Sequence, residues 1–291
     1  MRLLSFVWQG QTRWGLVEGD RVRPCPAEAG WPRSLLELIE LGDQAHEVLA
    51  RLTAQGGDTL PLEGLRLLAP IPRPRKNVIC LGLNYMAHAQ ESLAAKGQAV
   101  ERPEHPVVFT KAVTAVNGPY DDITLDPRVT SQLDWEVELA VIIGRGGRHI
   151  AEQDALRHVF GYTVLNDVTA RDLQMRHKQF FLGKSLDGSC PMGPALVTAD
   201  EIADVQNLTL RCWVNGVLKQ EGNTADQIFN VARTIAILSR SMTLEPGDII
   251  ATGTPDGVGF ARKPPEFLAA GDVLESEIEG LGRLRNRIVA A

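Results

Sequence analysis

The most constraining feature of this 291-residue chain is a series of short runs rich in Val, Ile and Leu, separated by clusters of turn residues, from about residue 77 onwards. Short runs of this kind are typical of β-strands. Helical spacing appears here only at 85–96, 152–159 and 228–241, so the pattern predicts a mixed α/β, β-rich domain without regular strand–helix alternation. The expected strands are 77–81, 106–110, 136–143, 160–166, 194–198, 207–214, 248–252, 273–279 and 283–289.

A proline-rich segment, 70–74, divides this region from the part of the chain that precedes it. Proline fixes φ and removes a backbone donor, so the segment is interpreted as a stiff linker. Two strand-like runs and two segments with helical spacing come before it, at 2–8, 13–18, 35–39 and 43–54. The sequence therefore predicts a small N-terminal α+β domain at 1–70 and a main domain at 71–291.

Composition and charge exclude several classes of function. The formal net charge is −6, so the chain lacks the basic surface that nucleic-acid binding requires. No apolar run reaches the roughly 18 residues that a membrane span needs, and the first residues do not resemble a signal peptide. The four cysteines lie far apart without a C-x-x-C pair, which argues against a zinc knuckle or a disulfide scaffold. We expect a cytoplasmic protein with reduced thiols.

Three acidic residues that lie in one expected strand or directly after another suggest a metal site. Residues 134–143 read Asp-Trp-Glu-Val-Glu-Leu-Ala-Val-Ile-Ile, and alternation along a strand puts Glu136 and Glu138 on one face, with Cα atoms roughly 7 Å apart. The opposite face is apolar and is expected to pack in the core. Asp167 follows the apolar run 161–165. Isolated glutamate pairs more often face solvent, but three carboxylates without a competing His–Cys set are the oxygen ligands that Mg²⁺ or Mn²⁺ prefers.

A histidine and a glutamate form a second candidate site. His88 and Glu91 are three residues apart in a segment with helical spacing, so they share one face of the helix. A carboxylate that binds an imidazole orients it and raises its basicity, although such pairs are also common on protein surfaces. The following segment, 96–106, is rich in glycine, proline and charge, which is typical of a mobile lid.

Two further segments could bind anionic groups. Gly183-Lys184-Ser185 resembles the end of a phosphate-binding loop, but Lys178 stands where that motif requires glycine, so nucleotide binding is not expected. Lys184 is interpreted as a cation for a developing oxyanion or a substrate carboxylate, against the alternative of a solvated lysine. The glycine-rich loop 251–259 could hold a carboxylate with its amides or form only a tight turn.

Several motifs follow one another in a characteristic order. They are Leu83-Asn84-Tyr85 with His88 and Glu91, Phe109-Thr110-Lys111, Asp134-Trp135-Glu136-Val137-Glu138-Leu139-Ala140, Asn166-Asp167-Val168-Thr169-Ala170-Arg171-Asp172-Leu173-Gln174, Gly183-Lys184-Ser185-Leu186-Asp187 with Cys190-Pro191, and Thr252-Gly253-Thr254-Pro255. In these motifs the chain resembles the fumarylacetoacetate hydrolase family over about residues 70–291. Stretches 180–190 and 260–268 are similar to the branch of the domain-containing protein 2 group and of 2-hydroxyhepta-2,4-diene-1,7-dioate isomerase-like proteins.

The resemblance implies a fold and a set of residue roles. The implied fold has mixed β-sheets in a roll- or barrel-like core, usually in a homodimer, with a variable N-terminal domain in some members. The residues with implied roles are Glu136, Glu138 and Asp167 for Mg²⁺ or Mn²⁺, His88 and Glu91 for water activation on a closing lid, Lys184 and Gln174 for polarising substrate oxygens, and Lys111, Arg171 and Thr254 for lining the pocket.

The implied function is a hydrolase that cleaves a C–C bond in a small 1,3-dioxo acid, such as an acylpyruvate or fumarylpyruvate, through an enolate. His88, held by Glu91, would deprotonate the attacking water. The same site would also suit decarboxylation or keto–enol exchange of oxaloacetate, or isomerisation of a 2-hydroxy-dienoic diacid from aromatic catabolism. The alternative outside enzymology is a metal-binding sensor or assembly protein. Among these reactions, hydrolysis is the slightly favoured prediction.

Overall fold

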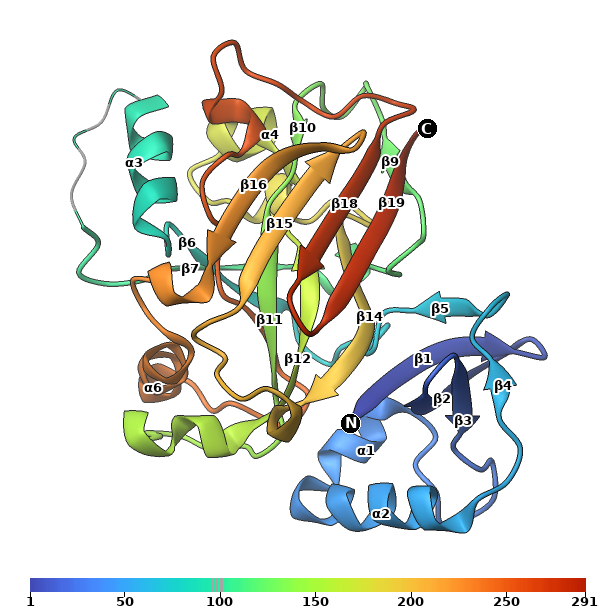
Figure 1. Ribbon diagram of the computed structural model, residues 1–291. Helices are drawn as coiled ribbons and strands as arrows, with labels where there is room; N and C mark the ends of the chain where they lie inside the picture. The colour runs from blue at the N-terminus through green and yellow to red at the C-terminus, as the bar shows by residue number, and fades with distance from the viewer. Residues whose placement is uncertain (96, 98, 100–101) are drawn as a thin grey trace.

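Most strands of the protein belong to one large mixed sheet (Figure 1). The structure is a computed structural model that describes residues 1–95, 97, 99 and 102–291, and this sheet has 12 strands within those residues. In spatial order they are β4 (Leu60–Pro61), β3 (Arg21–Pro24), β2 (Gln11–Glu18), β1 (Arg2–Trp8), β14 (Cys190–Thr198), β12 (Val159–Asn166), β11 (Val137–Ile143), β17 (Ile249–Ala251), β6 (Val78–Gly82) and β7 (Val107–Lys111), with β5 (Arg66–Leu68) beside β1 and β8 (Val116–Asn117) beside β14.

A second sheet packs against the centre of the first. Its strands are, in spatial order, β16 (Val217–Asn223), β15 (Thr209–Val214), β18 (Val273–Ile278), β19 (Gly282–Ala290) and β9 (Ile123–Leu125), and a separate pair joins β10 (Leu133–Asp134) to β13 (Thr169–Ala170). Leu139 and Val164 of the first sheet share one buried cluster with Leu210 and Leu274 of the second. Over the described residues neither sheet closes into a barrel, and the predicted mixed, β-rich fold class is confirmed.

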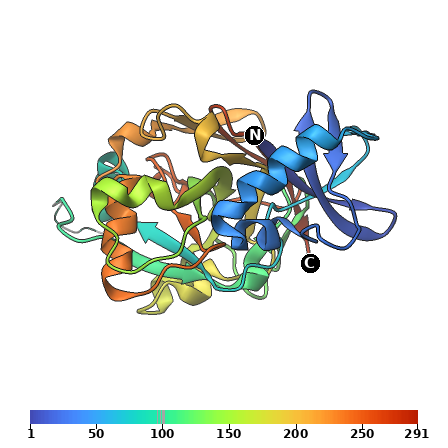
Figure 2. The ribbon, with the colours of Figure 1, turned by 90° about the horizontal axis from the view of Figure 1, so that it is seen from below.

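Helices cover the ends and one side of these sheets. They are α1 (Leu35–Glu40), η1 (Gly42–Gln44), α2 (Ala45–Gln55), α3 (Met86–Ala95), η2 (Val113–Ala115), η3 (Glu152–His158), α4 (Arg171–Arg176), α5 (Phe181–Lys184), η4 (Ala199–Glu201), η5 (Thr224–Asp226), α6 (Val231–Ser241) and η6 (Gly259–Ala261). Helices α1, α2, η3 and α6 lie at the same end of the molecule (Figures 1 and 2). None of the described helices combines the length and the apolar character that crossing a bilayer requires.

Strand β11 is buried on both faces, as a central strand with layers on either side should be. Leu139 and Val141 point into the cluster between the two sheets, which confirms the predicted apolar face. Ala140 and Ile142 point the other way, into a cluster shared with α1 and α2. The opposite face is therefore also packed along most of its length, and only its first part, around Glu138, is left to form a site.

Residues 1–70 extend the large sheet through β1. This strand pairs with β14 in antiparallel register, with Arg2 opposite Val197 and Leu3 opposite Leu196. Backbone pairing between segments so far apart in sequence cannot be read from local patterns. The division of the chain into domains at residue 70 stays a prediction.

Local structure follows the expected elements with a few differences. The segment predicted to be helical at 152–159 is a 3₁₀ helix. The strand Val217–Asn223 and the short helix Phe181–Lys184 are not among the elements expected from the sequence. The predicted lid segment 96–106 lies partly outside the described residues, which resume at 102. The helix that carries His88 lies beside the loop of η6 (Figure 1).

Candidate active site and metal centre

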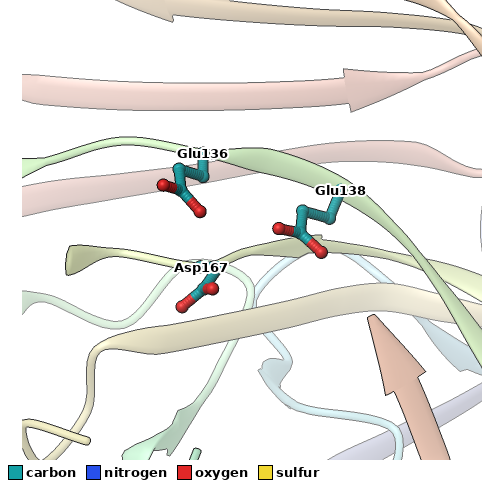
Figure 3. Close-up of side chains that lie close together, drawn as sticks. All are labelled: Glu136, Glu138 and Asp167. Carbon is teal, nitrogen blue, oxygen red and sulfur yellow. The ribbon is translucent and has the colours of Figure 1, made fainter. Parts of the chain in front are cut away.

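Three carboxylates meet where β11 and β12 pair (Figure 3). In this antiparallel pair Val137 lies opposite Asn166, and this register brings Glu136, just before β11, beside Asp167, just after β12. The amide of Asp167 donates to the carbonyl of Glu136 at 2.8 Å. One oxygen from each of Glu136, Glu138 and Asp167 lies within 4.8 Å of the others, and all three side chains are buried. The structure thus brings the three predicted metal ligands together.

Three cations surround these carboxylates. Nζ of Lys184 lies 2.6 Å from Oε2 of Glu136 and 2.7 Å from Oδ2 of Asp167. Nζ of Lys111 lies 2.8 Å from Oδ1 of Asp167, and Nη2 of Arg171 lies 2.6 Å from Oε1 of Glu136. All three cations are buried. Each of these cations pairs directly with Glu136 or Asp167, two of the three carboxylates. Such pairing offsets the free energy that it costs to remove these charges from water.

Glu138 is the carboxylate left without a cation among the described residues. Its Oε2 accepts a hydrogen bond from the amide of Gly253 at 2.8 Å. Burial raises its pKa, and the charges of Asp167 and Glu136 raise the pKa further, well above its usual range. Burial also opposes the ionisation of Glu136, but the charges of Lys184 and Arg171 outweigh it and lower that pKa to about 2.

The donor set fits a hard divalent cation. Three buried carboxylates converge, and one of them, Glu138, faces like charges without an ion-pair partner in the described chain. A divalent cation would relieve this repulsion, and carboxylate oxygens are the ligands that Mg²⁺ and Mn²⁺ prefer. The described part of the chain places no cysteine or histidine in this group.

His88 and Glu91 form the predicted pair on α3. Nδ1 of His88 lies 3.0 Å from Oε1 of Glu91, and the hydroxyl of Ser92 lies 3.4 Å from both ring nitrogens. Glu91 also accepts from the amide of Gly257, at 3.0 and 3.1 Å from its two oxygens, and from that of Val258 at 3.4 Å. The glycine-rich loop therefore does hold a carboxylate, and that carboxylate belongs to the protein itself.

One pocket joins the His88 pair to the carboxylates. It contains about 530 Å³ of empty space, part of which is open to solvent. The predicted residues on its wall are His88, Glu136, Glu138, Arg171, Gln174, Lys184 and Thr254. Lys111, Glu91 and Asp167 stand behind this wall as partners of other site residues. The hydroxyl of Thr254 donates to the carbonyl of Val137 at 2.8 Å, so it also anchors the strand.

The wall also contains apolar and hydroxyl residues that the sequence does not single out as site residues. These residues are Leu81, Leu83, Ser92, Val107, Phe109, Phe180 and Phe260. They come from five separate segments, and no local pattern marks them as neighbours. Two of the rings contact site cations: Nζ of Lys184 lies 5.0 Å from the ring centre of Phe109, and the guanidinium of Arg171 lies 4.4 Å from that of Phe260.

Solved structures of similar sequence share this fold. Fumarylacetoacetate hydrolase from psychrophilic Exiguobacterium antarcticum aligns with a TM-score of 0.88 and 42% identity over the full length of both chains. Maleylpyruvate hydrolase from Sphingobium sp. SYK-6, in complex with manganese(II) ion and pyruvate, aligns with a TM-score of 0.79 and 32% identity, again over both full chains.

Sequence comparison gives the same family and a narrower branch. Oxaloacetate tautomerase YisK of Bacillus subtilis (strain 168) is 50% identical over 88% of this chain and 87% of its own. The human mitochondrial oxaloacetate tautomerase FAHD2A is 46% identical over 89% of this chain and 80% of its own. The family model for an Rv2993c-like N-terminal region matches residues 1–70, and the model for the fumarylacetoacetate (FAA) hydrolase C-terminal region matches residues 77–289. The chain therefore belongs to the fumarylacetoacetate hydrolase family, in the branch of the domain-containing protein 2 and isomerase-like members.

Proposed function

We propose that this enzyme interconverts the keto and enol forms of oxaloacetate at a site that holds Mg²⁺ or Mn²⁺. The observation that carries the proposal is that His88, which binds Glu91, lines the same pocket as Glu136 and Glu138, two of the three convergent carboxylates. The names of relatives at 50% and 46% identity support oxaloacetate as the substrate. The manganese and pyruvate complex of a neighbour at 32% identity supports the ion and the class of 2-oxo acid.

The chain's own residues account for the proton transfer. Glu91 is only an acceptor, so Nδ1 of His88 donates to it and Nε2 is the basic nitrogen of the neutral ring. Nε2 takes a proton from C3 of oxaloacetate, the electron pair of the C–H bond forms the C2=C3 double bond, and the π pair of the C2 carbonyl moves onto its oxygen. This oxygen takes up a proton from the protonated His88 ring, which returns to its neutral form. No electrons are gained or lost overall. A divalent ion held by Glu136, Glu138 and Asp167 would supply a Lewis acid that makes the C3 proton more acidic.

Two polar side chains would orient the substrate. Oε1 of Gln174 accepts from Nη1 of Arg171 at 3.0 Å, so the amide nitrogen of Gln174 is available as a donor to a substrate oxygen. Lys184 holds its ammonium between Glu136 and Asp167, beside the ligand atoms. A fixed positive charge at that point favours the enolate form of a bound 2-oxo acid.

Hydrolysis of an acylpyruvate is the second candidate. The same His88 and Glu91 pair can deprotonate a water molecule that attacks the C4 carbonyl, after which the C3–C4 bond breaks and C3 is protonated. The name of the maleylpyruvate hydrolase neighbour favours this reading. Tautomerisation is placed first because the relatives named as tautomerases are the more similar in sequence.

Product-resolved NMR separates these reactions. The purified protein, loaded with Mn²⁺ or Mg²⁺ or treated with a chelator, would be offered oxaloacetate, acetylpyruvate and fumarylpyruvate in separate samples. We expect metal-dependent exchange of the C3 protons of oxaloacetate and approach to keto–enol equilibrium above the uncatalysed rate. An acyl acid plus pyruvate would establish the hydrolase instead, and pyruvate with CO₂ from oxaloacetate would establish a decarboxylase.

Gly183 allows α5 to pack directly on α4 and so fixes the distance between Lys184 and Gln174. A Cβ at this position would lie 2.5 Å from the backbone nitrogen of Gln174 and 2.8 Å from the carbonyl oxygen of Ala170. These are backbone atoms, so α5 would have to move. We expect Gly183→Ala to lower kcat/KM on the order of 10- to 100-fold, measured by steady-state kinetics.

The control for this variant is Leu182→Ala, which shortens an exposed side chain of the same helix. Its kcat/KM should stay within about twofold of the wild-type value, because exposed positions away from contacts tolerate substitution. A wild-type rate in Gly183→Ala would show that the spacing of α4 and α5 does not matter for turnover.

A further inference from the structure

Asp134 is a buried carboxylate of the site to which the proposed chemistry assigns no role. It lies in β10 and is fully buried, and each of its oxygens accepts two hydrogen bonds. Oδ2 accepts from Nε of Arg171 at 2.7 Å and from the amide of Phe260 at 3.0 Å. Oδ1 accepts from the amides of Gly259 at 2.7 Å and Trp135 at 2.8 Å. These four hydrogen bonds fix the position of the carboxylate and of the groups that donate to it.

The first of these groups, Arg171, reaches into the pocket. Its Nη2 lies 2.6 Å from Oε1 of Glu136, and its Nη1 donates to Gln174. A guanidinium is planar, so the bond from Nε to Asp134 fixes the direction in which the other two nitrogens point. Without that bond, Arg171 could rotate away from Gln174 and the orientation of both donors would be lost.

The second group is the loop of residues 257–260. A Cβ on Gly259 would lie 2.6 Å from Oδ1 of Asp134, so the loop approaches this carboxylate closely. The preceding amides, those of Gly257 and Val258, donate to Glu91, which binds His88. The loop thus donates hydrogen bonds to Asp134 through its last two amides and to Glu91, on the helix that carries His88, through its first two.

We propose that Asp134 is the positioning residue of this site, because its buried carboxylate binds both Arg171 and the 257–260 loop. The same loop also binds Glu91, the partner of His88. The proposal rests on the proposed function only in treating Arg171 and His88 as residues that face a 2-oxo acid. Asp134 is not among the residues that line the pocket, and the four donors to its oxygens belong to other residues than the three convergent carboxylates. Its effect is transmitted through the groups that donate to it.

The test compares Asp134→Asn with the wild-type full chain by two measurements that do not require turnover. The first is hydrogen exchange of the amides in 257–260 in the metal-free protein, and the second is the affinity of the Mn²⁺-loaded protein for oxalate, a planar mimic of an enolised 2-oxo acid. Asparagine places an NH₂ group against two of the four donors. We expect about tenfold faster exchange or more, and about tenfold weaker oxalate binding, from the loss of two charge-assisted bonds.

The matched control is Asp256→Asn, an exposed aspartate next to the same loop. Exchange and oxalate affinity in this variant should equal those of the wild type. If Asp134→Asn does not fold, Asp134→Glu serves in its place, because it keeps the carboxylate and its charge but shifts the two oxygens away from the four donors. Unchanged loop exchange and unchanged oxalate affinity, in whichever of the two variants is folded, would overturn the proposal.

A failure of the proposed function gives a different result. A wild-type protein that binds oxalate but does not tautomerise oxaloacetate would contradict the reaction and leave the positioning test intact. A variant that is less stable, but whose loop exchange and oxalate affinity match the wild type, would assign Asp134 a purely structural role and would overturn the inference. In the active enzyme we expect Asp134→Asn to raise KM and to lower kcat, since both Arg171 and His88 lose their fixed positions.

Discussion

Replacing Glu138 by glutamine should lower kcat/KM for oxaloacetate by about 10³-fold, since a Lewis-acid metal contributes several kcal/mol to such a reaction. The variant keeps the size of the side chain and the acceptor for the amide of Gly253. It removes one of the three carboxylates that would hold the proposed ion, so the affinity for Mn²⁺ should fall by about 100-fold or more. Isothermal titration with Mn²⁺ and steady-state kinetics at several Mn²⁺ concentrations would measure the two effects separately.

The same variant should not weaken the metal-free fold. Burial and like-charged neighbours disfavour a charge on Glu138 in the metal-free protein, and it has no cation partner among the described residues, so a neutral replacement breaks no ion pair. Glu136→Gln differs, because it leaves Lys184 and Arg171 without part of their compensation in a buried site. We therefore expect the metal-free melting temperature of Glu138→Gln to equal or exceed that of the wild type, and that of Glu136→Gln to lie below it.

Glu221→Gln provides the control for charge removal, because Glu221 is an exposed glutamate that pairs with Arg211 on the second sheet. This variant should retain wild-type activity and Mn²⁺ affinity. Full activity in Glu138→Gln, with Mn²⁺ binding unchanged, would show that the reaction does not depend on the three carboxylates.

The sequence predicted that Glu136, Glu138 and Asp167 lie together, because much of their arrangement follows from short-range rules. Strand alternation places Glu136 and Glu138 on one face, and Asp167 follows directly after a second strand. The structure adds the register of β11 and β12, which decides that these carboxylates meet. Asp134 lies two residues before Glu136 and so continues the same alternation. The alternation alone assigns no role to this residue.

The rest of the site depends on contacts between distant segments, which local patterns do not encode. Phe260 reaches the pocket from a loop about 90 residues after Arg171, and only the folded chain brings its ring over that guanidinium. Lys111 was expected on the pocket wall, whereas it lies behind Asp167 as a buried partner. The pairing of β1 with β14 is likewise a tertiary event. Residue type and spacing identify reactive groups, and packing decides which of them face the substrate.

The His88→Ala variant should lose about 10²- to 10⁴-fold in kcat while its affinity for Mn²⁺ stays at the wild-type value. In the proposed reaction His88 supplies the basic nitrogen, and it lies outside the group of three carboxylates, so the two measurements should separate. Exchange of the C3 protons of oxaloacetate into D₂O, followed by NMR with the uncatalysed rate subtracted, reads the proton transfer directly. His46→Ala, which alters an exposed histidine on α2, should match the wild type in both measurements. A wild-type exchange rate in His88→Ala would remove the imidazole from the mechanism and would require another base on the pocket wall, whereas loss of exchange with intact metal binding would identify His88 as the group that takes the proton.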